Sequence, residues 1–155
     1  MKHILFAALL LTAVPPAHAQ TGPYISPGLQ IGYGSGQGFF FSAQVSAGII
    51  VEGIAPAVTI GIRQYKDQTM RYADVQLSLV FAGIGFGRVW VTPGDKSGEG
   101  SGTMTGPRFK LYGGLWALGS YDFYKLPGQP IKHHLGMFLV FPIFDYGTVI
   151  GFGIW

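Results

Sequence analysis

The sequence predicts an all-β protein: a single closed, antiparallel, up-and-down transmembrane β-barrel of about eight strands. Three observations lead to this prediction. Apolar residues alternate with small or polar ones at a period of two, as in "GFFFSAQVSAGIIVE" at 38–52. Charged residues make up only 11% of the 155 residues, against about 25% in a typical soluble domain. Twenty-five glycines disfavour long helices, and the lack of cysteine excludes disulfides.

The first residues have the layout of an export signal. Lys2 gives a basic start, an apolar run follows at 4–14, and Ala-His-Ala at 17–19 offers a cleavage site. The apolar run is too short to span a bilayer as a helix, which needs roughly 20 residues. We therefore expect residues 1–19 to be a signal peptide and residues 20–155 to form one barrel domain.

Four strands with clear alternation are expected in the first half of the mature chain. The first spans about 27–35, and a Gly-rich turn leads from it into the second at 38–52. After "GIAP", the third strand lies in "AVTIGIRQYK" and the fourth at about 69–82. Each has one apolar face and one face of small or polar residues, which is the pattern of a strand that separates two environments.

The second half of the chain is predicted to supply four more strands. The fifth, at about 84–91, alternates poorly, whereas the sixth, at about 107–118, alternates well. The seventh spans about 131–142, and the eighth is "GTVIGFGIW" at the end of the chain. Residues 119–130 either extend the sixth strand or form a short hairpin of their own. Strands of about 9–11 residues in an even number are typical of bacterial membrane barrels.

The composition of the second face indicates which side of the strands meets lipid. In a soluble sandwich this face would carry Lys, Glu and Thr, but here it carries mostly Ser, Gln and Gly. Small residues suit the crowded interior of an eight-stranded barrel. Lipid also requires closure, because every backbone group must be paired. The few charges should pair inside, and we predict a lumen polar network of Glu52, Arg63, Asp74, Arg88 and Arg108.

Two other architectures stay open at this point. A periplasmic β-barrel or sandwich would show the same alternation. A soluble periplasmic barrel of this kind could bind a hydrophobic ligand. An α-helical membrane protein is disfavoured because Gly residues, Pro142 and Asp145 interrupt the apolar C-terminal stretch.

The expected topology places both termini in the periplasm. The connections that would then face outside are 35–37, 66–69, 92–106 and 143–147. The longest, "TPGDKSGEGSGTMTG", is rich in Gly and Ser and should be a solvated loop. Its charged residues Asp95, Lys96 and Glu99 are predicted to be exposed and available to an extracellular or envelope partner. Residues 119–130 would form a long periplasmic connection.

Signals for catalysis or metal binding are weak. His133 and His134 are neighbours on a strand, so their side chains point to opposite faces and cannot chelate one metal together. We therefore expect no metal and no cofactor. Ser120, Asp122 and His134 could supply the nucleophile, acid and base of a lipid acyl hydrolase or transferase, but their spacing is not specific. An open pore is not expected, because the interior of eight strands is filled by side chains.

An export signal, eight alternating segments and a terminal aromatic together resemble the small bacterial outer-membrane β-barrels, the class of the OmpA transmembrane domain and OmpX. The resemblance implies a place in the Gram-negative outer membrane, contact with its lipid, and insertion by the barrel-assembly machinery through Trp155. We expect a structural, envelope-stabilising or loop-mediated interaction role, with a lipid-modifying barrel enzyme as the alternative. The net charge of +3 comes from scattered residues, so nucleic-acid binding is not expected.

Overall fold

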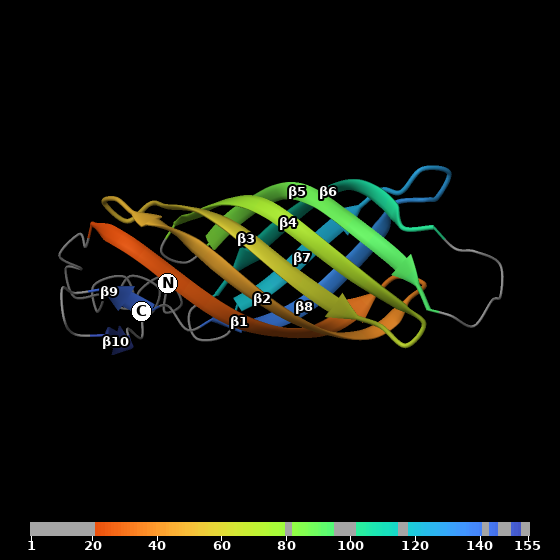
Figure 1. Ribbon diagram of the computed structural model, residues 1–155, viewed down its shortest axis with the longest axis horizontal. Helices are drawn as coiled ribbons and strands as arrows, with labels where there is room; N and C mark the ends of the chain where they lie inside the picture. Colours follow the sequence, from red (N-terminus) through yellow and green to blue (C-terminus); the bar gives the residue numbers. More distant parts are fainter. Residues whose placement is uncertain are drawn as a thin grey trace, which may run out of the picture.

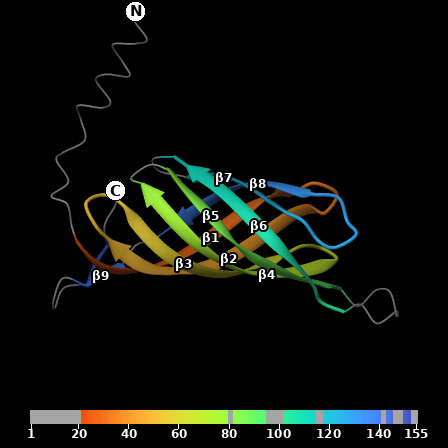
Figure 2. The ribbon, with the colours of Figure 1, turned by 90° about the horizontal axis from the view of Figure 1, so that it is seen from above.

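The computed structural model describes residues 21–79, 82–94, 102–114, 118–140, 143–145 and 150–152. In these ranges the chain is all-β, and eight antiparallel strands close into a barrel (Figures 1 and 2). The prediction of a closed, antiparallel, up-and-down barrel of eight strands is confirmed. None of the described residues belongs to a helix long and apolar enough to cross a membrane. The wall strands are β1 (Gly22–Gly34), β2 (Gly38–Ile50), β3 (Ala55–Gln64), β4 (Gln68–Leu79), β5 (Ala82–Pro93), β6 (Met104–Gly113), β7 (Leu118–Tyr124) and β8 (Lys132–Val140).

The wall closes with a large stagger between its strands. Each strand pairs with its sequence neighbours, and β1 also pairs with β8. Tyr24 on β1 is paired with Gly48 on β2, and following the paired residues from strand to strand leads around the barrel to His134 on β8. His134 is paired with Gly34, so one circuit returns to β1 ten residues beyond its starting point. With about 3.3 Å per residue and about 4.8 Å between strands, this stagger corresponds to a strand tilt of about 40°. Figure 1 shows the oblique course of the strands.

One of the eight wall strands, β7, was not predicted as a separate strand, and one predicted strand, the last, is not part of the closed wall. Residues 118–124 form β7, which pairs with both β6 and β8, so this part of 119–130 belongs to the wall. The expected eighth strand at the C-terminus is wrong. There, β10 (Ile150–Phe152) pairs with β9 (Ile143–Asp145). β9 in turn pairs with the start of β1, in the same register in which β8 pairs with the rest of β1. The terminal hairpin therefore lies beyond the closing pair of strands.

The two ends of the barrel carry different connections. One end, the loop end, has the turns at 35–37 and 65–67 and the connection 125–131, and β5 and β6 are also joined there. The opposite end, the terminal end, holds the turn at 51–54, the start of β1, and β9 and β10 (Figure 1). Residues 125–131 therefore lie at the same end as the long β5–β6 connection, which corrects the expected periplasmic placement of 119–130. The segment 143–147 was expected at the loop end, but its described part lies at the terminal end.

The alternation of the strands separates an apolar outside from a polar inside. Large apolar side chains point outward and are exposed, such as Val75 at 67% and Leu135 at 66%. The buried inward positions carry many polar residues, including Gln30, Gln44 and Thr59. Near the loop end the interior is filled by a cluster of larger side chains: Phe40, Tyr65, Met70, Tyr72, Val89, Val91, Tyr124 and Leu126. The distribution is the inverse of a soluble domain, in which apolar groups are buried and charges meet water.

Candidate functional site

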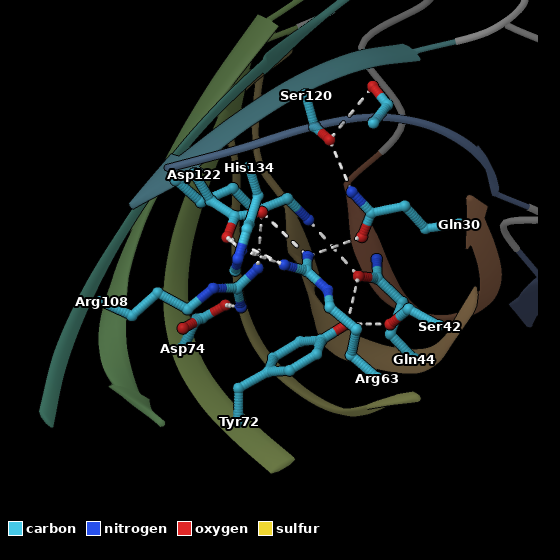
Figure 3. Close-up of polar contacts among 12 residues, drawn as sticks. Gln30, Ser42, Gln44, Arg63, Tyr72, Asp74, Arg108, Ser120, Asp122 and His134 are labelled. Carbon is cyan, nitrogen blue, oxygen red and sulfur yellow. Dashed lines mark hydrogen bonds and ion pairs between the residues drawn. The ribbon is translucent and has the colours of Figure 1, made fainter. Parts of the chain in front are cut away.

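Six ionisable side chains meet inside the barrel, and we call them the charged cluster: Arg63, Asp74, Arg108, Lys110, Asp122 and His134. All six are buried, with at most 2% of each side chain exposed. Figure 3 labels five of them, Arg63, Asp74, Arg108, Asp122 and His134, which project from different strands toward one another. Period-two alternation puts them there, since Arg108 and Lys110 are two residues apart on β6, and β7 places Asp122 directly between Lys110 and His134.

Arg63 and Asp122 form the centre of the charged cluster. Nη1 and Nη2 of Arg63 donate to Oδ1 and Oδ2 of Asp122 at 3.1 and 2.9 Å. This two-pronged geometry is the strongest form of an Arg–carboxylate pair. Arg63 also donates to Oε1 of Gln30 at 3.1 Å, and its guanidinium lies 4.0 Å from the centre of the Phe40 ring. These contacts tie β3 to β7, across the interior of the barrel.

Arg108 links the second carboxylate to the first. Its Nη1 donates to Oδ2 of Asp74, while its Nη2 lies 3.3 Å from Oδ2 of Asp122. The guanidinium lies 4.0 Å from the centre of the Tyr72 ring. Gly87 is paired with both Asp74 and Arg108, so the position between the two charged side chains carries no side chain of its own. A Cβ at Gly87 would lie 1.9 Å from the carbonyl oxygen of Ala73.

Lys110 has no carboxylate partner among the described residues. Its Nζ lies 3.3 Å from Oε1 of Gln44 and above the rings of Tyr112 and Phe138, at 5.1 and 4.5 Å from their centres. Aromatic faces attract cations, with a gain of about 2 kcal/mol or more when the cation is desolvated. The charged cluster thus has three basic side chains and two carboxylates, a formal excess of one positive charge when His134 is neutral.

The contacts of His134 favour its neutral form with the proton on Nε2. Nδ1 lies 2.5 Å from Nη1 of Arg63, which can only donate, so Nδ1 is the acceptor. Nε2 then donates to Oε1 of Gln37 at 2.7 Å, and Gln37 donates onward to the hydroxyl of Tyr124 at 2.5 Å. A second proton on the ring would improve the contact of Nδ1 with Asp122 at 2.9 Å. It would also add a cation to an interior that already has an excess of positive charge.

The structure places three of the five residues predicted for the lumen polar network, Arg63, Asp74 and Arg108, inside the barrel. Arg63 and Arg108 both contact Asp122, and Arg108 also pairs directly with Asp74. Glu52 is exposed in the two-residue turn between Val51 and Ile54, where its φ of 50° and the positive φ of Gly53 suit a hairpin turn.

Arg88 is the second member that does not join the network. It points outward from β5 and is exposed, because the inward positions of that strand are the odd-numbered ones, such as Gly87 and Val89. The alternation of β5 is hard to read from sequence, since glycines occupy several of its inward positions.

Several members of the interior network were not predicted to belong to it. Lys110 shares a face of its strand with Arg108, so the alternation alone was enough to find it. Asp122 and His134 were considered only as catalytic candidates, because the strand that carries Asp122 was not recognised. The neutral partners Gln30, Gln44 and Tyr72 have no sequence signal beyond their position on a polar face.

The catalytic candidates do not form a triad. Asp122 and His134 are adjacent, but Nε2 of His134 faces Gln37 and the hydroxyl of Tyr65, at 2.7 and 3.0 Å, rather than Ser120. The Ser120 hydroxyl instead accepts from Nε2 of Gln30 at 2.6 Å and donates to the carbonyl of Gly136 at 3.3 Å. A serine nucleophile needs its base within hydrogen-bond reach.

An apolar hollow of about 620 Å³ lies beside Ser120, lined also by Leu77, Leu111 and Leu135. Asp122 and His134 do not line it. The described residues therefore place the serine and the Asp–His pair in separate surroundings, without the contact that acyl transfer requires.

Comparisons with protein-family models, with curated proteins and with solved structures gave no match. Within the described ranges, no three His, Cys, Asp or Glu side chains converge as metal ligands would. Asp95, Lys96, Glu99 and Trp155, to which the sequence assigned roles in loop exposure and assembly, lie outside the described residues.

The chemical effect of the charged cluster is to hold the barrel together. It joins five of the eight wall strands through bonds that run across the interior, and its members are shielded from solvent. Burying an ion pair costs several kcal/mol per ion in desolvation, and removal of one partner then costs about 3–5 kcal/mol because it leaves an unpaired buried charge. We interpret the cluster as a structural core that takes the place of a hydrophobic one.

Proposed function

We propose that the protein is an integral outer-membrane β-barrel with a structural, envelope-stabilising or loop-mediated interaction role. The observation that carries this proposal is the inverted burial of the barrel, with charges inside and large apolar side chains outside. Among the described residues, isoleucine, leucine, valine or phenylalanine side chains are exposed on seven of the eight wall strands, all except β7. A soluble monomer rarely exposes apolar patches of more than a few hundred Å². Contact with the acyl chains of a bilayer would keep these apolar side chains out of water.

The size of the apolar surface supports the same proposal. β1 and β2 have 13 residues each, and at a tilt of about 40° each residue advances about 2.5 Å along the barrel axis. The longest wall strands therefore span roughly 30 Å, close to the hydrocarbon thickness of a bilayer. Among the described outward positions of the wall strands, the charged residues are Arg71 and Arg88, which lie near the loop end, and uncharged polar residues gather at the same end: Gln64, Thr69, Thr92, Thr105 and His133.

The side chains that fill the interior support a closed barrel rather than an open channel. Near the loop end, Phe40, Tyr65, Tyr124 and Leu126 are buried against one another and against the charged cluster. Eight-stranded barrels leave room only for their own side chains, whereas aqueous channels occur with about 16–18 strands. The protein reconstituted in a planar bilayer is expected to show no stable single-channel conductance. Ohmic steps would contradict a closed interior.

Export and assembly complete the proposal. Residues 1–19 would direct the chain across the inner membrane, and the barrel-assembly machinery would insert it with Trp155 as part of the recognition signal. Both described chain ends lie at the terminal end of the barrel, which would face the periplasm. The loop at 92–106, with Asp95, Lys96 and Glu99, would then reach outward to an extracellular or envelope partner.

Cell fractionation tests the proposed location and role. The full chain should sediment with the outer membrane, resist extraction by alkaline carbonate, and migrate differently on gels before and after boiling. Lipid extracted from cells with and without the protein should give the same mass spectrum, as expected for a non-enzymatic barrel. Recovery in the soluble periplasmic fraction would contradict the location, and a lipid species that depends on the protein would contradict the role.

A further inference from the structure

The outward surface of the wall carries very few charges, and those that it carries lie together. Among the outward positions of the described strands, Arg71 on β4 and Arg88 on β5 are the charged residues, and both are exposed. Lys125, one residue beyond β7, is also exposed and follows the same alternation. Arginines on a lipid-facing surface cost free energy unless an anionic group pairs with them.

The strand registers place these basic residues side by side. Trp90 is paired with Arg71, and Arg88 is paired with Ala73, so the two arginines are diagonal neighbours with Cα atoms about 7–8 Å apart. Pro107 is paired with Arg88 on one side, and its carbonyl accepts from the amide of Lys125 on the other. Arg88 and Lys125 therefore stand about two strand spacings apart, roughly 10 Å. We call Arg71, Arg88 and Lys125 the outer basic patch.

The outer basic patch lies at the level where a membrane interface is expected. With the stagger of ten residues around the wall, Arg71, Arg88 and Trp90 come within roughly 5 Å of the axial level of Tyr33 and His133. Outward Tyr and Trp side chains near one end of a barrel are typical of the interface between acyl chains and headgroups. Lipid phosphates are found at this depth.

No protein group compensates the arginines in the part of the chain that the structure describes. Neither Arg71 nor Arg88 has a hydrogen bond or an ion pair there, whereas Arg63 and Arg108 in the interior contact both buried carboxylates. Asp74, the acidic residue nearest to them on β4, points inward. Among the described residues, the interior arginines thus have carboxylate partners and the two outer arginines do not.

We propose that Arg71 and Arg88, assisted by Lys125, bind the phosphate of a net-anionic lipid headgroup in the leaflet at the loop end. This inference rests on the proposed membrane location. Guanidinium groups match phosphate through paired hydrogen bonds, and they lose less hydration than lysine does on entering an interface. The indole of Trp90, which lies two residues from Arg88 on β5 and is paired with Arg71, supplies an amphipathic surface for the glycerol or sugar portion of the lipid.

Lipid binding by the mature protein in detergent tests this inference. Phosphatidylglycerol, which is anionic, and phosphatidylcholine, which is zwitterionic, are titrated separately, and bound lipid is counted by native mass spectrometry. The wild type should bind phosphatidylglycerol more tightly. The double variant Arg71→Gln/Arg88→Gln should lose roughly 10- to 30-fold in that affinity, since each basic group near a membrane surface contributes about a factor of five.

The matched control is Lys66→Gln/Lys132→Gln, which removes two charges at the same end of the barrel but outside the outer basic patch. It should bind phosphatidylglycerol as the wild type does. An equal loss in the control, no loss in the arginine variant, or equal binding of both lipids by the wild type would overturn the inference. Displacement of the lipid by millimolar inorganic phosphate would also overturn it, because the site would then serve a free anion.

Flotation with lipid vesicles separates this failure from that of the proposed function. Wild type and both variants should float with phosphatidylcholine vesicles, because insertion depends on the apolar wall. A wild type that floats but shows no anionic preference would refute the lipid site alone. A wild type that does not float would refute the membrane location as well as the lipid site.

Discussion

The substitution Asp122→Asn is expected to be the most damaging single change in the charged cluster. Asp122 is the one carboxylate that contacts both Arg63 and Arg108 within the described interior. The interior has three basic side chains and two carboxylates, so the loss of Asp122 raises the formal excess from one positive charge to two. Removing one partner of a buried ion pair costs about 3–5 kcal/mol, and we expect that loss in the free energy of unfolding.

Arg63→Met provides the contrasting variant. It lowers the formal excess from one to zero and leaves Asp122 with Arg108, whose Nη2 is 3.3 Å away. The methionine side chain can still pack on Phe40, over which the guanidinium lies. The remaining cost is that of the lost hydrogen bonds, about 1–3 kcal/mol. The two substitutions alter the same ion pair, so a difference between them measures the effect of the charge excess.

Urea unfolding of the mature protein in detergent, followed by tryptophan fluorescence and gel mobility, measures both variants. Glu52→Gln is the control, since it removes an exposed carboxylate from the β2–β3 turn and should shift stability by no more than about 0.5 kcal/mol. If Asp122→Asn is as stable as the wild type, or if Arg63→Met is the less stable of the two, the account of the charged cluster is refuted.

Three further changes have definite expected outcomes. Val75→Arg, on the most exposed large apolar side chain of the described residues and away from both ends of β4, should lower stability in vesicles by about 2–4 kcal/mol. Thr69→Arg at the loop end should cost at most about 1 kcal/mol, because it lies near the membrane interface. Equal losses of unfolding free energy in urea for the Val75 and Thr69 variants would show that the cost does not depend on depth in the bilayer. Gly87→Ala places a Cβ 1.9 Å from a β4 carbonyl oxygen and should cost at least about 1–3 kcal/mol, whereas Gly102→Ala meets open space and should be neutral by thermal unfolding. Tyr72→Phe loses bonds to two interior side chains but keeps the ring under Arg108, so calorimetry should show a smaller loss than for Tyr72→Leu.

Much of the fold could be predicted because the period of a strand is two and each strand of a closed wall faces two different environments. β2 carries apolar residues at every outward position, and β4 does so from Ala73 to Leu79, so the existence and orientation of both strands follow from the pattern. β7 could not be read in this way, since its outward positions carry Gly119, Tyr121 and Phe123 and it has only seven residues. The last strand was misassigned because the C-terminal segment alternates as well, although it lies beyond the closing pair.

The site could be predicted only in part, because alternation assigns a face but not a partner. It placed Arg63 and Asp74 inside, yet Arg63 pairs with Asp122, 59 residues away in the chain, rather than with Asp74. Contacts across the interior depend on the stagger of the wall, which is fixed by the sum of all strand registers. The pattern within a single strand therefore does not reveal which residues meet across the interior. Arg88 shows the converse case, in which a charge on a glycine-rich strand faces outward and was assigned to the wrong side.

The behaviour of the folded mature chain when detergent is withdrawn tests the central claim most directly. Analytical ultracentrifugation before and after removal, with circular dichroism on the same samples, reports the assembly state and the strand content. We predict a β-rich monomer in detergent that aggregates in plain buffer and is recovered by added lipid. A chain that remains monomeric and β-rich in buffer, with no amphiphile present, would show that the apolar wall is compatible with water and would contradict the membrane assignment.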